Sequence, residues 1–111
     1  MNKFMRILVL FDIPVKTKYQ RHVASRFRHF LLKDGYYMLQ YSVYARICNG
    51  PDAVEKHRQR LMGALPDNGS VRMVVLTEKQ YEAIDVLVGR YLPEEKAYDA
   101  KHVSVFLKTT E

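Results

Sequence analysis

Cysteine occurs once in this sequence, at position 48, so no disulfide can form within the chain and an oxidising compartment is not indicated. No apolar run approaches the length of about 20 residues that a membrane-spanning helix needs. The N-terminus resembles a signal peptide only faintly, because its apolar run stops after five residues, Ile7 to Phe11, and no small-residue cleavage site follows. We therefore expect a soluble, cytoplasmic protein with no membrane partner.

Several chemical motifs are also missing. No GxGxxG or GxxxxGK pattern is present, so a nucleotide cofactor is not indicated. No HExxH or CxxC pattern occurs, which argues against zinc. His22 and His29 then belong with the basic face of a helix, and Cys48 is more in keeping with a buried or edge thiol than with a nucleophile.

The 111 residues suffice for one domain with a core of its own, and 48% hydrophobic with 27% charged residues is a globular balance. No internal repeat or low-complexity tract divides the chain. Residues 1–89 are expected to form the core. Residues 90–101 resemble a linker, and together with a final strand they make up a C-terminal segment, residues 90–111.

Local patterns predict five strands and two helices. Continuous or alternating apolar residues predict strands at 6–11, 36–48, 71–77, 83–89 and 102–107, the first of them central and covered. Thr17-x-x-Gln20 is typical of a capping box that opens a helix ending at Gly35, with Tyr19, Val23, Phe27 and Phe30 or Leu31 on its apolar stripe. Asp52 is expected to cap a second helix, with Val54, Leu61 and Leu65 buried and Pro66 beyond its end. Thr77-x-x-Gln80 predicts another capped turn.

The first four strands and two helices suit a ferredoxin-like α/β sandwich. In this α+β arrangement a mostly antiparallel four-stranded sheet carries both helices on one face. The fifth strand, 102–107, follows a connection long enough to leave its own core, so we expect it to pair with the sheet edge of a second copy in a homodimer.

Positive charge is concentrated in the first half of the chain. The whole sequence has a net charge of +6, but residues 1–50 hold nine Lys and Arg against only Asp12 and Asp34. Between positions 16 and 33 there is no acid, and six cations occur: Lys16, Lys18, Arg21, Arg26, Arg28 and Lys33. This pattern gives up the opposite-charge pairs that support an exposed helix, so it favours a polyanionic partner over a merely soluble basic surface.

Asp12 ends the first apolar strand, and Pro14 closes the exit two residues later. A carboxylate at this place beside a basic helix has the chemistry to hold Mg²⁺ or Mn²⁺ against a phosphate, although Asp-Ile-Pro fits a turn equally well. One carboxylate is few for Mg²⁺, so a twofold partner would supply a second Asp12. Ser42 is a candidate to orient a water or phosphate near Asp12.

Four tyrosines in the second predicted strand have two interpretations. Tyr36, Tyr37, Tyr41 and Tyr44 could stack on bases, but aromatic residues are also common in strands, and we favour core and sheet surface for most of them.

Taken together, these residues resemble a known family. The strand-ending FDIP, the basic helix with Arg21, the segment DGYYMLQYSVYAR and the turn TEKQY resemble CRISPR-associated protein 2, in the variant found beside a single large effector nuclease. The Gly35…Gln40-x-Ser42-Val43 and Thr77-x-x-Gln80 patterns carry the resemblance jointly over nearly the whole chain. Phe11 stands where many members have Tyr, which leaves Asp12 unchanged.

The resemblance implies a symmetric homodimer with a divalent metal at Asp12 and metal-dependent endonuclease activity on RNA or DNA. It also implies a role in CRISPR adaptation, where the dimer bridges two copies of the integrase and grips the duplex backbone. Three hypotheses stay open: a Mg²⁺-dependent phosphodiesterase, a non-catalytic DNA-binding adaptor, and a ribonuclease toxin of the same fold.

Overall fold

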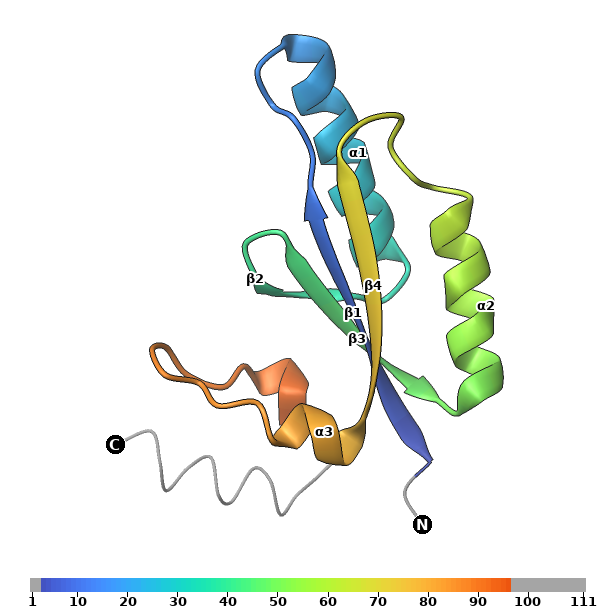
Figure 1. Cartoon of the computed structure of the whole chain (residues 1–111), viewed down its shortest axis with the longest axis vertical. Coiled ribbons are helices and arrows are strands. Elements are labelled where there is room, and N and C mark those ends of the chain that lie inside the picture. Colours follow the sequence, from blue (N-terminus) through green and yellow to red (C-terminus); the bar gives the residue numbers. More distant parts are fainter. Residues whose placement is uncertain (1–2, 97–111) are drawn as a thin grey trace.

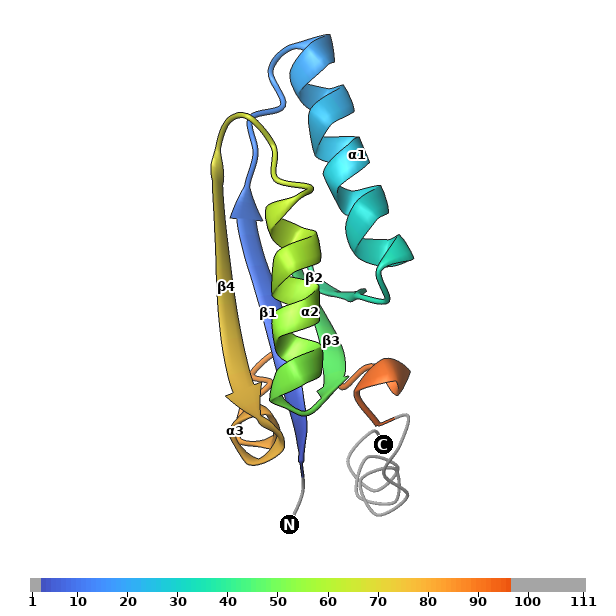
Figure 2. The same cartoon turned by 90° about the vertical axis from the view of Figure 1, so that its right-hand side faces the viewer.

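The computed structural model describes residues 3–96 of the chain. Its elements are β1 (Phe4–Asp12), α1 (Lys18–Lys33), β2 (Tyr37–Gln40), β3 (Val43–Asn49), α2 (Pro51–Met62), β4 (Ser70–Thr77), α3 (Glu78–Glu82) and the 3-10 helix η1 (Pro93–Lys96). The four strands form one antiparallel sheet in the order β2-β3-β1-β4 (Figure 1). Figure 2 shows α1 and α2 on the same side of this sheet, which confirms the ferredoxin-like fold.

The central strand β1 has two different faces. Ile7, Val9 and Phe11 are buried in the core between the sheet and the helices. Leu8 and Leu10 alternate to the other face, where they are half-buried, because neither α1 nor α2 lies on that side (Figure 2). The strand is therefore central, as predicted, but its helix-free face is less covered than a continuous apolar run suggested.

Local signals determine both ends of α1. The Thr17 side chain accepts a hydrogen bond from the Gln20 main chain at 3.1 Å, and the Gln20 side chain accepts one from the Thr17 main chain at 3.0 Å. Gly35 ends the helix with a φ of 92°, which glycine adopts without steric cost. The buried face of the helix consists of Ala24, Phe27 and Leu31. Tyr19 was expected on this face, but its side chain is 63% exposed, so that expectation is wrong.

The single long strand expected at 36–48 is in fact a hairpin. β2 and β3 pair with each other, and Gln40 lies opposite Val43, so Tyr41 and Ser42 form a two-residue turn. Ser42, the second residue of the turn, has a φ of 64°, in the left-handed region that a type II turn requires at this place. Because neither turn residue is Gly, Asn or Asp, the usual sequence signature of the turn is missing.

The second helix, α2, begins two residues earlier than predicted. Gly50 is its N-cap residue and Pro51 its first helical residue, whereas Asp52 lies inside the first turn, where a negative charge is favourable. Val54 and Leu61 are buried as expected. Leu65 follows the helix and is 43% exposed, because it lies in the connection to β4 rather than on the buried face.

The C-terminal part of the sheet differs from the prediction. β4 and the capped turn at Thr77 and Gln80, which opens α3, are confirmed. Residues 83–89 form no strand, and Leu87 and Val88 are 88% and 95% exposed. The β-branched residues in this segment favour a strand, but no strand of the described chain pairs with it. Within the expected linker, residues 93–96 form η1. The predicted strand 102–107 lies outside the described residues.

In the part of the chain that the structure describes, no helix is both long and apolar enough to span a membrane.

Candidate functional site

Asp12 is the last residue of β1 and its side chain is exposed. It lies opposite Ser70 of β4 in the strand register, on the helix-free face together with Leu8 and Leu10. Its main chain is paired with β4, and Gly69, which precedes β4, lies close to its carbonyl oxygen. The carboxylate thus leaves the sheet at a fixed point rather than from a mobile loop, as the sequence predicted.

Within residues 3–96, no cluster of three or more His, Cys, Asp or Glu side chains is placed to hold a metal ion. One copy of the described chain therefore offers Asp12 as a single carboxylate. Mg²⁺ usually takes one or two protein carboxylates and completes its shell with water and phosphate oxygens, so an exposed Asp fits a hard cation but does not enclose it.

Ser42 is brought next to Asp12 through its main chain. The Phe11 amide donates a hydrogen bond to the Ser42 carbonyl at 3.1 Å, which extends the contact between β1 and the hairpin beyond the last strand pair. The left-handed turn at Ser42 is therefore anchored one residue before Asp12. The predicted role of the Ser42 hydroxyl in positioning water or phosphate stays a prediction.

The six predicted cations do not form a single surface. Arg21 donates from Nη1 to the carbonyls of Val15 and Lys16 at 3.2 and 3.0 Å, so it holds the loop that enters α1. Arg28 turns to the hairpin, where its Nη2 donates to the Tyr41 hydroxyl at 3.2 Å. Three lysines stay exposed along or beside the helix: Lys16, Lys18 and Lys33.

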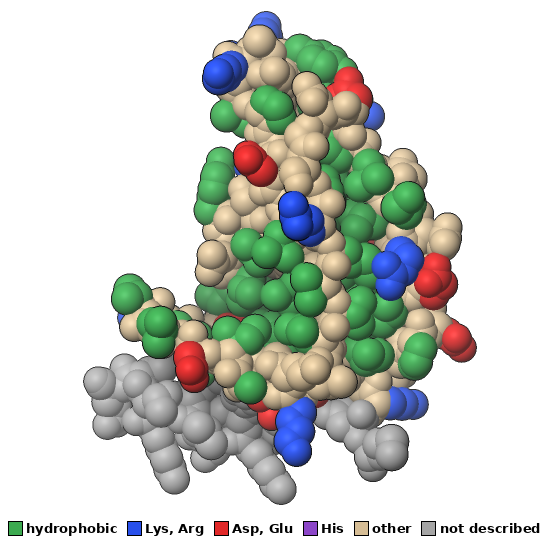
Figure 3. Space-filling model, in the orientation of Figure 1, with side chains coloured by type: hydrophobic (Ala, Val, Ile, Leu, Met, Phe, Trp, Pro, Cys, Tyr) green, Lys and Arg blue, Asp and Glu red, His purple; other side chains and the backbone are tan. Residues whose placement is uncertain are grey.

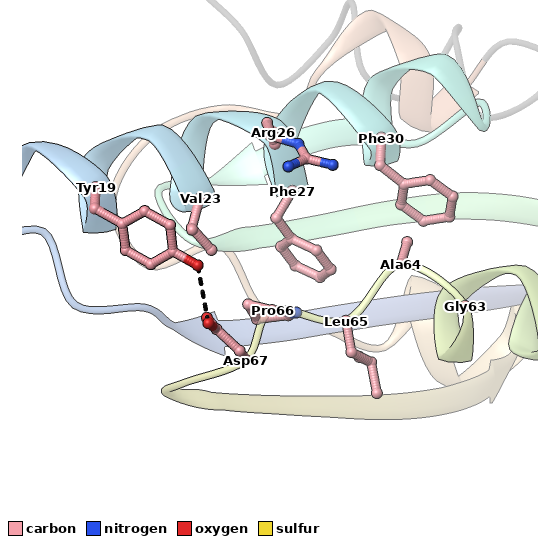
Figure 4. Close-up of a pocket in the computed structure, with 10 residues that line it drawn as sticks. All are labelled: Tyr19, Val23, Arg26, Phe27, Phe30, Gly63, Ala64, Leu65, Pro66 and Asp67. Carbon is pink, nitrogen blue, oxygen red and sulfur yellow. Dashed lines mark hydrogen bonds between the residues drawn. The ribbon is translucent and has the colours of Figure 1, made fainter.

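Arg26 belongs to a different surface. It lines a groove of about 480 Å³ between α1 and the connection from α2 to β4 (Figure 4). Phe27 and Phe30 form part of the apolar wall, and the Tyr19 hydroxyl closes one end by donating to Asp67 at 2.9 Å. Arg26 and Arg28 therefore lie on different sides of α1, although the sequence placed both in one basic run.

A buried polar network at the other end of β1 was not predicted. Arg6 has no exposed surface and donates to Glu78 at 2.5 Å and to the Tyr37 hydroxyl at 2.7 Å. Tyr81 lies under its guanidinium at 4.3 Å and donates to Glu95 at 2.6 Å. Burial raises the pKa of the Tyr81 hydroxyl, and the hydrogen bond to Glu95 raises it further, so this group stays protonated. The network ties β1 to β2, α3 and η1, which is a structural role.

A second missed cluster joins the two helices. The Asp34 carboxylate accepts hydrogen bonds from His57 Nδ1 and Arg60 Nη1, both at 2.8 Å. Burial alone raises the pKa of the Asp34 carboxyl, but the hydrogen bonds and positive charge of His57 and Arg60 outweigh it and lower the pKa below its usual value. Arg46 of β3 donates to the Asp34 carbonyl, so the end of α1 is fastened to α2 and the sheet.

Comparison with known proteins agrees with this arrangement. The family model described as CRISPR associated protein Cas2 matches residues 5–84, which include all but the first residue of β1, both long helices, the hairpin and β4. The CRISPR-associated endoribonuclease Cas2 of Acidovorax ebreus is 51% identical over 102 residues, covering 92% of this chain and all of the relative. The protein of the same name from Campylobacter jejuni is 40% identical over 105 residues, covering 95% of this chain and 73% of the relative. With Asp12 at the end of its first strand, the chain belongs to the CRISPR-associated protein Cas2 family.

Proposed function

We propose that this protein is a Mg²⁺- or Mn²⁺-dependent endonuclease of CRISPR adaptation, which hydrolyses phosphodiester bonds in RNA or DNA. The observation that carries the proposal is Asp12, an exposed carboxylate held rigidly at the end of the central strand of a Cas2-family fold. The relatives from Acidovorax ebreus and Campylobacter jejuni are named endoribonucleases, which supports nuclease chemistry.

Asp12 is the residue that would hold the metal. A divalent ion bound there would supply Lewis-acid stabilisation of a phosphate and a more acidic water. The protein itself contributes the orientation of the carboxylate, through the β1–β4 pairing and the hydrogen bond from Phe11 to Ser42. Residues that must be aligned with a scissile phosphate are held more accurately by a strand end than by a flexible loop.

A homodimer would complete this site. Apolar side chains gather over the strands on the helix-free face of the sheet (Figure 3). Leu8 and Leu10 are half-buried there, and Val74 of β4, opposite Leu8, is 40% exposed. A twofold partner seated on this face would cover these side chains and bring its own Asp12 toward the first, which provides the second carboxylate that one chain lacks.

Nucleic acid is the expected substrate because of the cations on α1. Lys16, Lys18 and Lys33 are exposed, and Arg28 lies on the hairpin side of the helix near the end of β1. Contacts from such side chains to phosphates carry no sequence information, so binding should be independent of sequence and should weaken as salt rises.

A non-catalytic adaptor is the second candidate function. It is favoured by one observation, namely that no group of three metal ligands exists within the described residues. In this case the dimer would bridge copies of the CRISPR integrase and hold DNA through its cations, and the Asp12 carboxylate would be dispensable. A ribonuclease toxin of the same fold is not favoured, because the family match and the named relatives are CRISPR-associated.

The deciding experiment compares wild type with Asp12→Asn. Labelled single-stranded RNA, single-stranded DNA and duplex DNA are incubated with each protein in Mg²⁺, Mn²⁺ or EDTA. Asp85→Asn is the matched control, since Asp85 is exposed and follows α3 at the opposite end of the sheet (Figure 1). We expect Asp12→Asn to lose at least about 100-fold in cleavage rate while it still binds, because several kcal/mol of charge stabilisation disappear.

Cleavage that persists in EDTA, or that is equal in wild type and Asp12→Asn, would contradict the nuclease proposal. The same variants tested for spacer acquisition in cells separate the two candidates. Acquisition that survives Asp12→Asn, in the absence of any metal-dependent cleavage by wild type, would support the adaptor.

A further inference from the structure

Tyr41 is the outlier among the four tyrosines of the β2–β3 region. Tyr36 and Tyr44 are each 3% exposed and belong to the core, and Tyr37 donates or accepts within the buried network around Arg6. Tyr41 lies at the turn of the hairpin and is 74% exposed. Core packing therefore explains three of these aromatic side chains but not the fourth.

The exposed ring of Tyr41 is nevertheless held in place. Arg28 donates to the Tyr41 hydroxyl at 3.2 Å, and its guanidinium carbon lies 5.2 Å from the centre of the Tyr41 ring. The same guanidinium lies 5.7 Å from the ring of buried Phe11, which fixes it against the core. An aromatic ring that is ordered before binding loses little conformational entropy when a ligand stacks on it.

The turn places Tyr41 beside the end of β1, on the side of the sheet that faces α1. The hydrogen bond from the Phe11 amide to the Ser42 carbonyl, 3.1 Å, joins the two segments, and Asp12 follows Phe11 while Tyr41 precedes Ser42. Ser42 adopts its left-handed φ of 64° at this point. A non-glycine residue keeps such a conformation when the surrounding structure imposes it, and such residues concentrate at functional sites.

An exposed aromatic ring with a guanidinium beside it matches one kind of ligand. Proteins bind single-stranded nucleic acid through aromatic rings that stack on unpaired bases and through cations that accompany the backbone. In a duplex the bases already stack on one another, so this ring could engage only an unpaired base or a splayed end.

We propose that Tyr41, positioned by Arg28, is a stacking platform for an unpaired base at the hairpin turn, on the side of the sheet that faces α1. This inference rests on the proposed function and adds to it a contact with an unpaired base at this turn. A contact surface for a protein partner is the alternative use of the same ring, and it is an outcome of the test.

The test uses single-stranded RNA with one 2-aminopurine at successive positions, in EDTA so that no strand is cut. Stacking on an aromatic ring quenches 2-aminopurine fluorescence, so wild type should quench it at one or a few positions. Tyr41→Ala should abolish that quenching and weaken binding about 5-fold or more, the lower end of what one stacked base contributes. Tyr41→Phe should retain both, because it keeps the ring.

Tyr19→Ala is the matched control. Tyr19 is also exposed, at 63%, and is also held by a hydrogen bond, but its ring lies in the groove beside Asp67 (Figure 4). We expect this variant to quench and bind as wild type does. Circular dichroism of the Tyr19 and Tyr41 variants verifies that each is folded.

Three results would overturn the inference. Unchanged quenching and affinity in Tyr41→Ala would show that the ring stacks on no base. An equal loss for duplex DNA and single strands would assign Tyr41 a role outside base stacking, such as a protein contact. Failure of wild type to bind any nucleic acid would refute the proposed function as well, whereas binding and cleavage that Tyr41→Ala leaves unchanged would refute the platform alone.

Discussion

Gly69 is the residue whose substitution should most directly disturb the position of Asp12. It precedes β4 with a φ of 95°, a conformation that L side chains rarely adopt. A Cβ atom at this position would overlap the main-chain carbonyl oxygen of Asp12 and lie 3.1 Å from the Ile13 Cα and 3.2 Å from the Pro14 Cδ. Gly69→Ala therefore forces the end of β1 to move.

Two terms determine the cost of this substitution. The positive φ costs about 1–3 kcal/mol for alanine, reduced by about 0.4–1 kcal/mol because alanine restricts the unfolded chain. Overlap with backbone atoms adds a shift that typically costs about 1–3 kcal/mol in a packed site. We expect a loss of roughly 2–5 kcal/mol, a large share of the stability of about 5–15 kcal/mol that a small domain has.

Gly50→Ala provides the matched comparison. Gly50 also has a φ of 95°, but a Cβ there would have no atom within 4 Å. It shares the backbone strain without the overlap, so Gly69→Ala should be less stable than Gly50→Ala by about 1–3 kcal/mol.

Urea denaturation of wild type and both variants measures these differences, and equal m-values would show that the three proteins unfold to similar denatured states. A Gly69→Ala protein as stable as Gly50→Ala would refute the argument that the close contact between residue 69 and the Asp12 main chain requires glycine. If the proposed function holds, cleavage should also fall more in Gly69→Ala than in Gly50→Ala.

The two buried polar clusters lead to two further predictions. Arg6→Met should cost about 3–5 kcal/mol in the free energy of unfolding, because it leaves the Glu78 carboxylate buried without its cation, and Arg6→Met combined with Glu78→Gln should cost less than Arg6→Met alone. Urea denaturation measures both, and additive costs would exclude the coupling. The lowered pKa of Asp34 stabilises the fold above the unfolded value of about 3.9, and this contribution is lost as the pH falls through the lower folded value. Wild type should therefore lose more stability than Asp34→Asn between about pH 5 and pH 3, and parallel pH profiles would contradict this role.

Sequence alone determined the features that depend on near neighbours in the chain. The strand that ends at Asp12 and the capping boxes at Thr17 and Thr77 were predicted because a strand face or a helix cap involves residues within four positions of one another. The ferredoxin-like fold class was predicted as well, although its fourth strand comes from the hairpin β2–β3 and not from the strand expected at 83–89.

Tertiary structure decided everything that depends on distant partners. Tyr41 and Ser42 form a turn because the hairpin packs on β1, while no partner strand exists for residues 83–89 in the described chain. Nothing near Arg6 in the sequence indicates its partner, because Glu78 lies 72 residues away in sequence and 2.5 Å away in space. A buried charge is stable only beside a compensating group. Alternation and capping patterns contain no information on such a group until the fold brings it near.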